Sequence, residues 1–222
     1  MQRKTIELNQ KILYQSFLLF LKKGYEDTTT REIAAACNIE RGVLHYHFHQ
    51  KQDILFELYR QFYSFLCDSI FDQFSDEDEA VLIIISDMLL YRILLTHTAL
   101  SRMMVSMMKN RDLTTGKITE TSRVLAEKTS QVARYPKIRF ALSIAIGAEV
   151  ELILQMTGNE IDLSLDELAK WVSGLALAAL GYTSADVDRY YHRALKCVEM
   201  FDEKAFAEKM ERNVMWFHHN DI

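Results

Sequence analysis

One short stretch of the sequence gathers side chains of the types that read nucleic acid. Between Glu40 and His47 an expected helix directs Leu44 to one side, and Phe48 follows four residues later. This pair can anchor the helix to a small core. The other positions carry hydrogen-bond donors, aromatic rings and one methyl-bearing residue, which reach base edges and phosphates when a helix enters the major groove. We interpret the stretch as a recognition helix.

Two sets of residues are expected to contact DNA. Direct or near base contact is expected from Arg41, Gly42, Val43 and Tyr46. Phosphate contact is expected from Thr30, His45, His47 and Lys51, together with the helix amides at residues 29–31, because helix amino termini bind anions. Gly42 has no side chain, so the backbone can approach a partner closely there.

A metal is the other chemistry that alternating histidines allow. His45, His47 and His49 would share one face of a strand. On a helix, successive members of this set point about 200° apart and cannot converge on one ion. Because the helical context is stronger, no metal site is expected.

The recognition helix needs a partner helix to hold it, and the preceding residues predict one. A helix beginning at Thr29 or Thr30 has Glu32 where a capping-box acid belongs. Asn38 supplies the residue with positive φ that a tight turn between helices requires. The buried face of this helix is expected to comprise Ile33, Ala34 and Cys37.

These residues resemble the DNA-binding signature of TetR-family transcriptional regulators. The matching motifs are Thr30-Arg-Glu-Ile-Ala, Gly42-Val-Leu-His-Tyr-His-Phe and Lys51-x-Asp-Ile-Leu, within roughly residues 5 to 60. Asn38 replaces the Gly that the family usually has at the turn, and Glu40 replaces its usual Ser or Thr. His45 stands where the family often has Tyr, with the aromatic residue displaced to Tyr46.

The resemblance implies an all-α, homodimeric, sequence-specific DNA-binding regulator whose partners are double-stranded operator DNA and a second copy of itself. It implies a repressor that responds to a ligand, although the residues alone do not distinguish repression from activation. Residues 1–51 are expected to form the helix-turn-helix domain. Residues 52–222 are expected to form a regulatory and dimerisation body, with extra helices over residues 184–222.

Composition supports this class of protein. The 222 residues include one Pro and seven Gly, which favours long helices. Residues 1–56 carry eight Lys and Arg against six Asp and Glu, whereas the whole chain has a net charge of −5, so the excess of basic residues is confined to the expected head. Three scattered cysteines indicate a reduced, cytoplasmic chain. The longest uncharged run has 15 residues, which is too short to predict a membrane span.

Helical periodicity and capping signals predict eleven helices. Their expected ranges are 5–23, 30–37, 40–47, 52–74, 77–95, 97–109, 117–133, 137–157, 165–181, 184–201 and 202–218, with a loop over 111–116. Pro136 is expected to open the eighth helix, and the pair Ser164 and Glu167 to cap the ninth. No Gly- or Pro-rich linker separates head from body.

Methionine and aromatic side chains in the body could line a pocket for a small apolar or amphipathic effector. The candidates are Phe62, Phe65, Met88, Tyr91, Met103, Met104, Met107 and Phe140. Ordinary core filling is the alternative interpretation of each. Small residues at helical spacing allow close helix packing in a dimer interface, for which the candidates are Ala141, Ala145, Ala148, Leu152, Trp171, Leu175 and Ala178. The alternative for these residues is packing within one chain.

The sequence also bears on two other classes of function. An enzyme is not expected, because the sequence has no nucleophile elbow, no metal-spaced ligand set and no phosphate loop, and no cofactor is predicted. An all-α protein-interaction module that does not bind DNA is the remaining alternative. Residues 184–222 could cap the dimer, wrap the partner subunit or cover the pocket.

Overall fold

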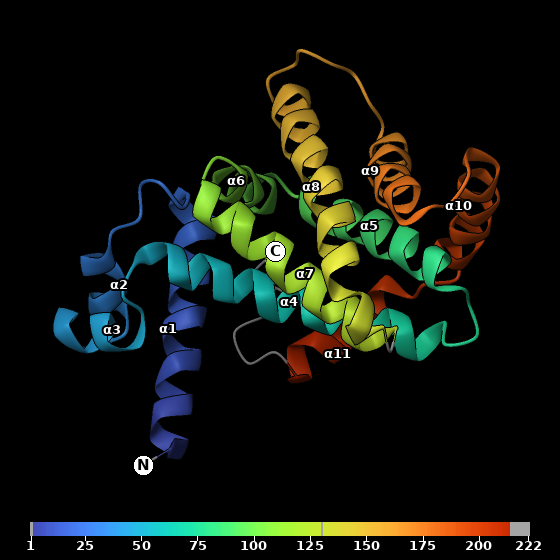
Figure 1. The fold of residues 1–222 in the computed structure, drawn as a ribbon. Helices are drawn as coiled ribbons and strands as arrows, with labels where there is room; N and C mark the ends of the chain where they lie inside the picture. Colours follow the sequence, from blue (N-terminus) through green and yellow to red (C-terminus); the bar gives the residue numbers. More distant parts are fainter. Residues whose placement is uncertain (1, 130, 214–222) are drawn as a thin grey trace.

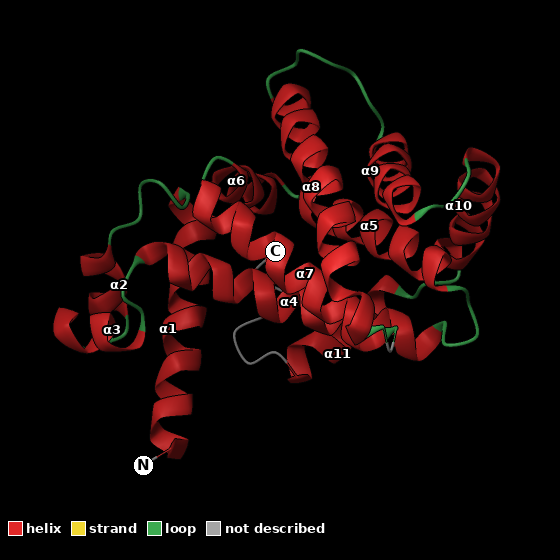
Figure 2. Cartoon of the chain, in the orientation of Figure 1, coloured by secondary structure: helices red, strands yellow, loops and turns green. Residues whose placement is uncertain are grey.

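A computed structural model of the chain describes residues 2–129 and 131–213, and within them every regular element is a helix (Figure 1, Figure 2). This confirms the all-α fold class. The elements are α1 (Gln2–Lys23), α2 (Thr30–Ala36), α3 (Arg41–His47), α4 (Lys51–Gln73), α5 (Glu79–Thr96), α6 (Thr98–Met108), α7 (Arg111–Lys128), the 3₁₀ turn η1 (Val132–Arg134), α8 (Tyr135–Thr157), α9 (Leu165–Leu180), α10 (Ser184–Glu199) and α11 (Glu203–Asn213).

The first three helices form a small head at one end of the molecule (Figure 1). Gly24 ends α1 with φ +91°, a conformation that glycine adopts without steric cost. Ile33 of α2 and Leu44 of α3 are almost fully buried and pack into the core with Phe20 of α1. Ile6 of α1 is exposed, because the amino-terminal part of α1 projects past α2 and α3 (Figure 1).

Helix α4 joins the head to the body without an interruption. It begins at Lys51 beside the head and continues along α7 and α5 of the body (Figure 1). Ile54, Leu55, Leu58, Leu66 and Ile70 are all nearly inaccessible to solvent. The domain boundary expected after residue 51 therefore falls at the first residue of α4, and the apolar face of this helix packs against both the head and the body.

Residues 111–116, expected to form a loop, are instead the first turns of α7. The side chain of Asn110 caps them by accepting hydrogen bonds from the amides of Asp112 (3.0 Å) and Leu113 (3.2 Å). Gly116 acts here as a packing residue: a Cβ at this position would lie 2.8 Å from Cε2 of Phe56. The prediction of a loop was wrong because a glycine can mark either a flexible loop or a close contact between helices, and here it marks the contact with α4.

The body is organised around α8 and α9, which lie side by side above α5 and α7 (Figure 1). Ser164 and Glu167 form the predicted capping box of α9, and Gly181 ends that helix with φ +105°. Helix α8 starts with Pro136 in its first turn, as expected. The predicted extension of α11 to residue 218 lies outside the described residues.

A buried ion pair connects two helices of the body. Nζ of Lys117 on α7 lies 2.5 Å from Oε1 of Glu149 on α8, and both side chains are almost inaccessible to solvent. Asp87 of α5 lies close enough to this pair to respond to both charges. Removing one partner of such a pair leaves the other charge buried and uncompensated, so the two residues fix how α7 and α8 meet.

Candidate nucleic-acid interface, cavity and apolar face

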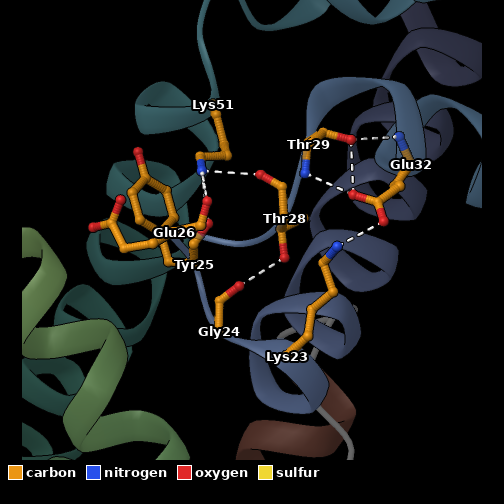
Figure 3. Close-up of polar contacts among 8 residues, drawn as sticks. All are labelled: Lys23, Gly24, Tyr25, Glu26, Thr28, Thr29, Glu32 and Lys51. Carbon is orange, nitrogen blue, oxygen red and sulfur yellow. Dashed lines mark hydrogen bonds and ion pairs between the residues drawn. The ribbon is translucent and has the colours of Figure 1, made fainter.

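The amino terminus of α2 is held by a complete capping box (Figure 3). The Thr29 amide donates to Oε2 of Glu32 at 2.9 Å, and the Glu32 amide donates to the Thr29 hydroxyl at 3.3 Å. Nζ of Lys23 donates to the other Glu32 oxygen at 2.6 Å. The hydrogen bonds from Lys23 and then Thr29 lower the pKa of Glu32 to about 2, so this carboxylate stays charged at neutral pH.

The turn after α2 has the predicted geometry. Asn38 has φ +53°, and its amide donates to the carbonyl of Ala35 at 3.0 Å. Helix α3 then starts after Glu40, whose side chain makes no capping hydrogen bond. Because Leu44 is buried and the turn is fixed, the rotation of α3 about its axis is also fixed.

Helix α3 exposes every residue that is expected to reach bases. Arg41, Gly42, Val43 and Tyr46 are all exposed, and Tyr46 is 80% accessible to solvent. A Cβ at Gly42 would meet nothing within 4 Å among the described residues, so no contact with them requires a glycine there. This face is therefore open to an external partner over its whole length.

The residues expected to contact phosphate divide into two groups. His45 is exposed, and its ring stacks edge-on against His49 with centroids 5.4 Å apart. Thr30 is half-buried at the start of α2. His47, also half-buried, contacts the side-chain oxygen of Asn9 on α1 through Nδ1, so its ring is tied to the head.

Lys51 is directed toward the loop between α1 and α2 (Figure 3). Its ammonium donates to the carbonyls of Tyr25 (2.6 Å), Thr28 (2.9 Å) and Glu26 (3.2 Å). No side-chain pattern in the sequence indicated these contacts, because the acceptors are backbone atoms that every residue carries.

A cavity of about 430 Å³ lies where head and body meet. Its apolar wall comes from α1, α4, α5, α6 and α11. Polar groups are supplied by Arg92, Thr96, His97, Glu203 and Lys204. The four sequence-predicted residues that line it are Phe62, Met103, Met104 and Met107. Met88 and Tyr91 are buried elsewhere in the core, and the Phe65 ring packs at a tilt against Phe206 with centroids 5.4 Å apart.

Helix α11 forms one side of this cavity. Phe206 and Met210 are buried there, and Phe206 also packs against Phe201 with ring centroids 5.5 Å apart. Of the three roles expected for residues 184–222, covering the pocket is the one in which the structure places α11. Sequence periodicity indicated this helix but contained no signal for the surface that it covers.

An apolar face is exposed on α8 and α9. Phe140, expected in the pocket, is 63% accessible on α8, and Ile144 lies exposed one turn later. Trp171, 63% accessible, and Leu175 occupy the same kind of position on α9, and Ala178 is exposed beyond them.

The predicted small-residue stripe of α8 is divided between two environments. Ala141 and Ala145 are buried within the chain, whereas Ala148 and Leu152 are half-buried. The surface available to a second copy is therefore rotated by about one residue from the stripe that spacing indicated, because the small residues already allow α8 to pack within its own body.

Helix α8 also has the length and composition of a membrane span. In the described part of the chain, Val132–Thr157 meets that criterion alone, and α5 with α6 meets it only if the bent pair is counted as one span. In the structure α8 packs against α7 and α9 and contains the buried Glu149. Some of the apolar side chains of α8 thus pack against α7 and α9, and others form the exposed face.

The amino-terminal region matches a known family. Residues 12–58 fit the model of bacterial regulatory proteins of the tetR family. The uncharacterised HTH-type transcriptional regulator YerO of Bacillus subtilis is 41% identical over 49 residues, which are 22% of this chain and 17% of YerO. The negative regulator of the biofilm operon icaADBC, IcaR of Staphylococcus aureus, is 40% identical over 47 residues, 21% of this chain and 25% of IcaR.

The chain thus matches at most a quarter of the length of these relatives, and the match lies in the head. A crystal structure of a putative TetR-family transcriptional regulator from Mesorhizobium loti is similar with a TM-score of 0.48 and 16% identity, over 79% of this chain and 96% of that one. The match over residues 12–58 confirms the family resemblance drawn from the sequence motifs.

Proposed function

We propose that the protein is a sequence-specific DNA-binding transcriptional regulator that acts as a homodimer. The observation that carries this proposal is α3, whose Leu44 is buried while Arg41, Val43 and Tyr46 face solvent. The helix therefore presents donors and a large aromatic ring on a rigid support, as direct readout of the major groove requires. The family match over residues 12–58 supports the same interpretation.

The exposed apolar face of α8 and α9 is the proposed dimer interface. Two copies joined there would cover Phe140, Ile144, Trp171 and Leu175, which are otherwise in contact with water. For both recognition helices to enter successive major grooves on one side of the duplex, they must lie about 34–36 Å apart. The operator should then be a near-palindrome.

The cavity is the proposed effector site, and repression the proposed mode of action. The apolar wall suits a ligand with an apolar body, and the charged groups of Arg92, Glu203 and Lys204 suit a polar end. Because α4 lines the cavity and also contacts the head, a ligand that prefers one position of α4 would change the spacing of the two heads. That IcaR is named a negative regulator supports repression.

Selection of bound duplexes from a random pool, followed by mobility-shift titration of the selected sequence, tests the proposal. We expect enrichment of a near-palindromic site and weaker retardation of a scrambled duplex. A chain that retards no duplex at low salt and without ligand would favour the alternative, a helical interaction module that does not bind DNA.

A further inference from the structure

The recognition helix α3 is tied to α1 by a polar contact between two side chains. Nδ1 of His47, the last residue of α3, lies within hydrogen-bond reach of Oδ1 of Asn9 on α1. Both side chains are half-buried, whereas Arg41, Val43 and Tyr46 of α3 are exposed. The contact therefore links the end of the recognition helix to a helix that lies outside the helix-turn-helix pair of α2 and α3.

The same contact determines which nitrogen of His47 carries the ring proton. A side-chain amide oxygen has lone pairs and no hydrogen, so it can only accept a hydrogen bond. Nδ1 of His47 must therefore carry the proton and donate to Asn9. The second nitrogen, Nε2, makes no hydrogen bond with the described residues, so it remains available to an outside partner. In the neutral ring Nε2 can accept from a base amino group but cannot donate to a phosphate.

The His47 ring in turn supports the side chain of Tyr46. The two rings meet edge-on, with centroids 5.4 Å apart and an interplanar angle of 86°, which is a favoured arrangement of an aromatic pair. Because Tyr46 is 80% accessible to solvent, this contact restricts a ring that would otherwise change rotamers rapidly. A ring that is already held in place loses less conformational entropy when it binds a partner.

We propose that Asn9 is a positioning residue for DNA readout by α3. Its oxygen holds His47 in the tautomer with the proton on Nδ1, and the His47 ring then orients Tyr46 for the major groove. Asn9 acts through His47 and does not itself touch DNA. The inference rests on the proposed function, since it names a residue outside the helix-turn-helix that prepares the recognition helix for its operator.

Nuclear magnetic resonance of the free protein tests the first step without DNA. Nitrogen-15 shifts of the His47 ring, measured at a mildly alkaline pH where an ordinary imidazole is neutral, should show the proton on Nδ1. Asn9→Leu keeps a side chain of similar size but has no acceptor, so the His47 shifts should move toward those of the exposed His49. Asn9→Asp keeps an oxygen acceptor and should preserve the tautomer.

Operator titration tests the second step. Asn9→Leu should bind the selected operator about two- to tenfold more weakly than wild type, which is the range of one hydrogen bond. His47→Phe keeps a ring beside Tyr46 but has no ring nitrogen, so Asn9 has nothing to hold. In that background Asn9→Leu should cost little further affinity, because a residue that acts through His47 loses its effect together with it.

The rotamers of Tyr46 separate positioning from a general loss of stability. Three-bond couplings that report its first side-chain torsion should indicate one dominant rotamer in wild type and an average over several in Asn9→Leu. Asn9→Asp should keep the single rotamer, whereas a general destabilisation of the head would affect both variants alike. Urea unfolding of the two variants shows whether the head remains folded.

Two results would overturn the inference: a wild-type His47 ring with its proton on Nε2, or an equal loss of affinity from Asn9→Leu in the wild-type and His47→Phe proteins. Should the wild-type protein bind no duplex, the proposed function fails, whereas the tautomer measurement still decides whether Asn9 holds His47.

Discussion

Tyr46 is the residue on which sequence readout should depend most. It is 80% exposed on α3, and its ring meets the His47 ring edge-on with centroids 5.4 Å apart. Tyr46→Ala should weaken binding to the selected operator by about 1–3 kcal/mol, in the range of one lost base contact, and flatten base preference at the positions nearest α3. Mobility-shift titrations against single-base operator variants measure both effects.

Tyr46→Phe is the matched control, because it keeps the ring and removes the hydroxyl. If hydrogen bonding by the hydroxyl carries the readout, the two variants should lose a similar amount of affinity; if stacking or methyl contact carries it, Phe should bind nearly as wild type. Unchanged affinity and base preference in Tyr46→Ala would remove this residue from the interface.

Asp87 should make the stability of the body depend on pH. Burial and, to a smaller extent, the charge of Glu149 raise the pKa of Asp87 to about 8, and Lys117 opposes the shift. An unfolded Asp titrates near about 4, so between about pH 4 and pH 8 the folded state binds the proton more tightly. The free energy of unfolding should therefore decrease as pH rises through this range.

Asp87→Asn should remove this dependence, since the amide cannot ionise. Urea unfolding at pH 5, 6.5 and 8 is the measurement, and the stability of the variant relative to wild type should increase with pH. The exposed Asp162→Asn reports the effect of removing an ordinary carboxylate. Parallel stability curves for wild type and Asp87→Asn would contradict the assigned pKa.

For single residues, the sequence predicted burial and backbone conformation better than it predicted hydrogen-bond partners. The buried Leu44 and the positive φ of Asn38 followed from local spacing and turn chemistry. The acceptors of Lys51 and the contact between His47 and Asn9 did not, because they join residues that are 23 or more positions apart. Which polar atom a long side chain meets depends on tertiary packing, which no local pattern encodes.

Among the helices, α11 should control the size of the cavity. Phe206→Ala removes a buried ring from its wall, so larger apolar ligands should bind more tightly. The free energy of unfolding should fall by no more than about 3–5 kcal/mol, the usual cost of replacing a buried Phe with Ala. Binding of a homologous series of alkyl carboxylates, together with urea unfolding, measures both quantities.

Glu208→Ala is the control on the same helix, since Glu208 is exposed. Wild type and this control should show the same optimal chain length, and Phe206→Ala a longer one. Reduced stability with an unchanged preference would mean that α11 packs on the body without shaping the ligand site.

Helix boundaries were predicted well where a capping residue marked them and poorly where glycine was ambiguous. The capping boxes of α2 and α9 formed at Thr29 and Ser164. The start of α7 was missed because Gly116 suggested a loop, although its role is to admit Phe56. In the stripe of α8 that spacing indicated, Ala141 and Ala145 are buried within the chain, since spacing cannot tell which apolar face of a helix packs inside its own body.

For the whole molecule, the exposed apolar face should determine the oligomeric state. Trp171→Arg places a charge in the proposed interface, and burying an unpaired charge is strongly unfavourable. The variant should sediment as a monomer at concentrations where wild type is a dimer, and it should bind the palindromic operator at least tenfold more weakly. Phe140→Arg should act in the same way from α8.

Met200→Arg tests whether any charge added to an exposed apolar site disrupts the molecule, because Met200 is exposed at the end of α10, outside this face. It should remain dimeric. A dimeric Trp171→Arg and a dimeric Phe140→Arg together would place the subunit contact elsewhere.

The uninterrupted passage of α4 from head to body has a consequence for engineering hybrid regulators. A head exchanged at residue 51 would be cut away from Leu55 and Leu58, which belong to the same continuous apolar core. In such a chimera the apolar side chains of the new head would not match those of α4, so we expect it to fold poorly. Grafting a new DNA specificity onto this body should therefore succeed by replacing only the outward side chains of α3, leaving the seam along α4 untouched.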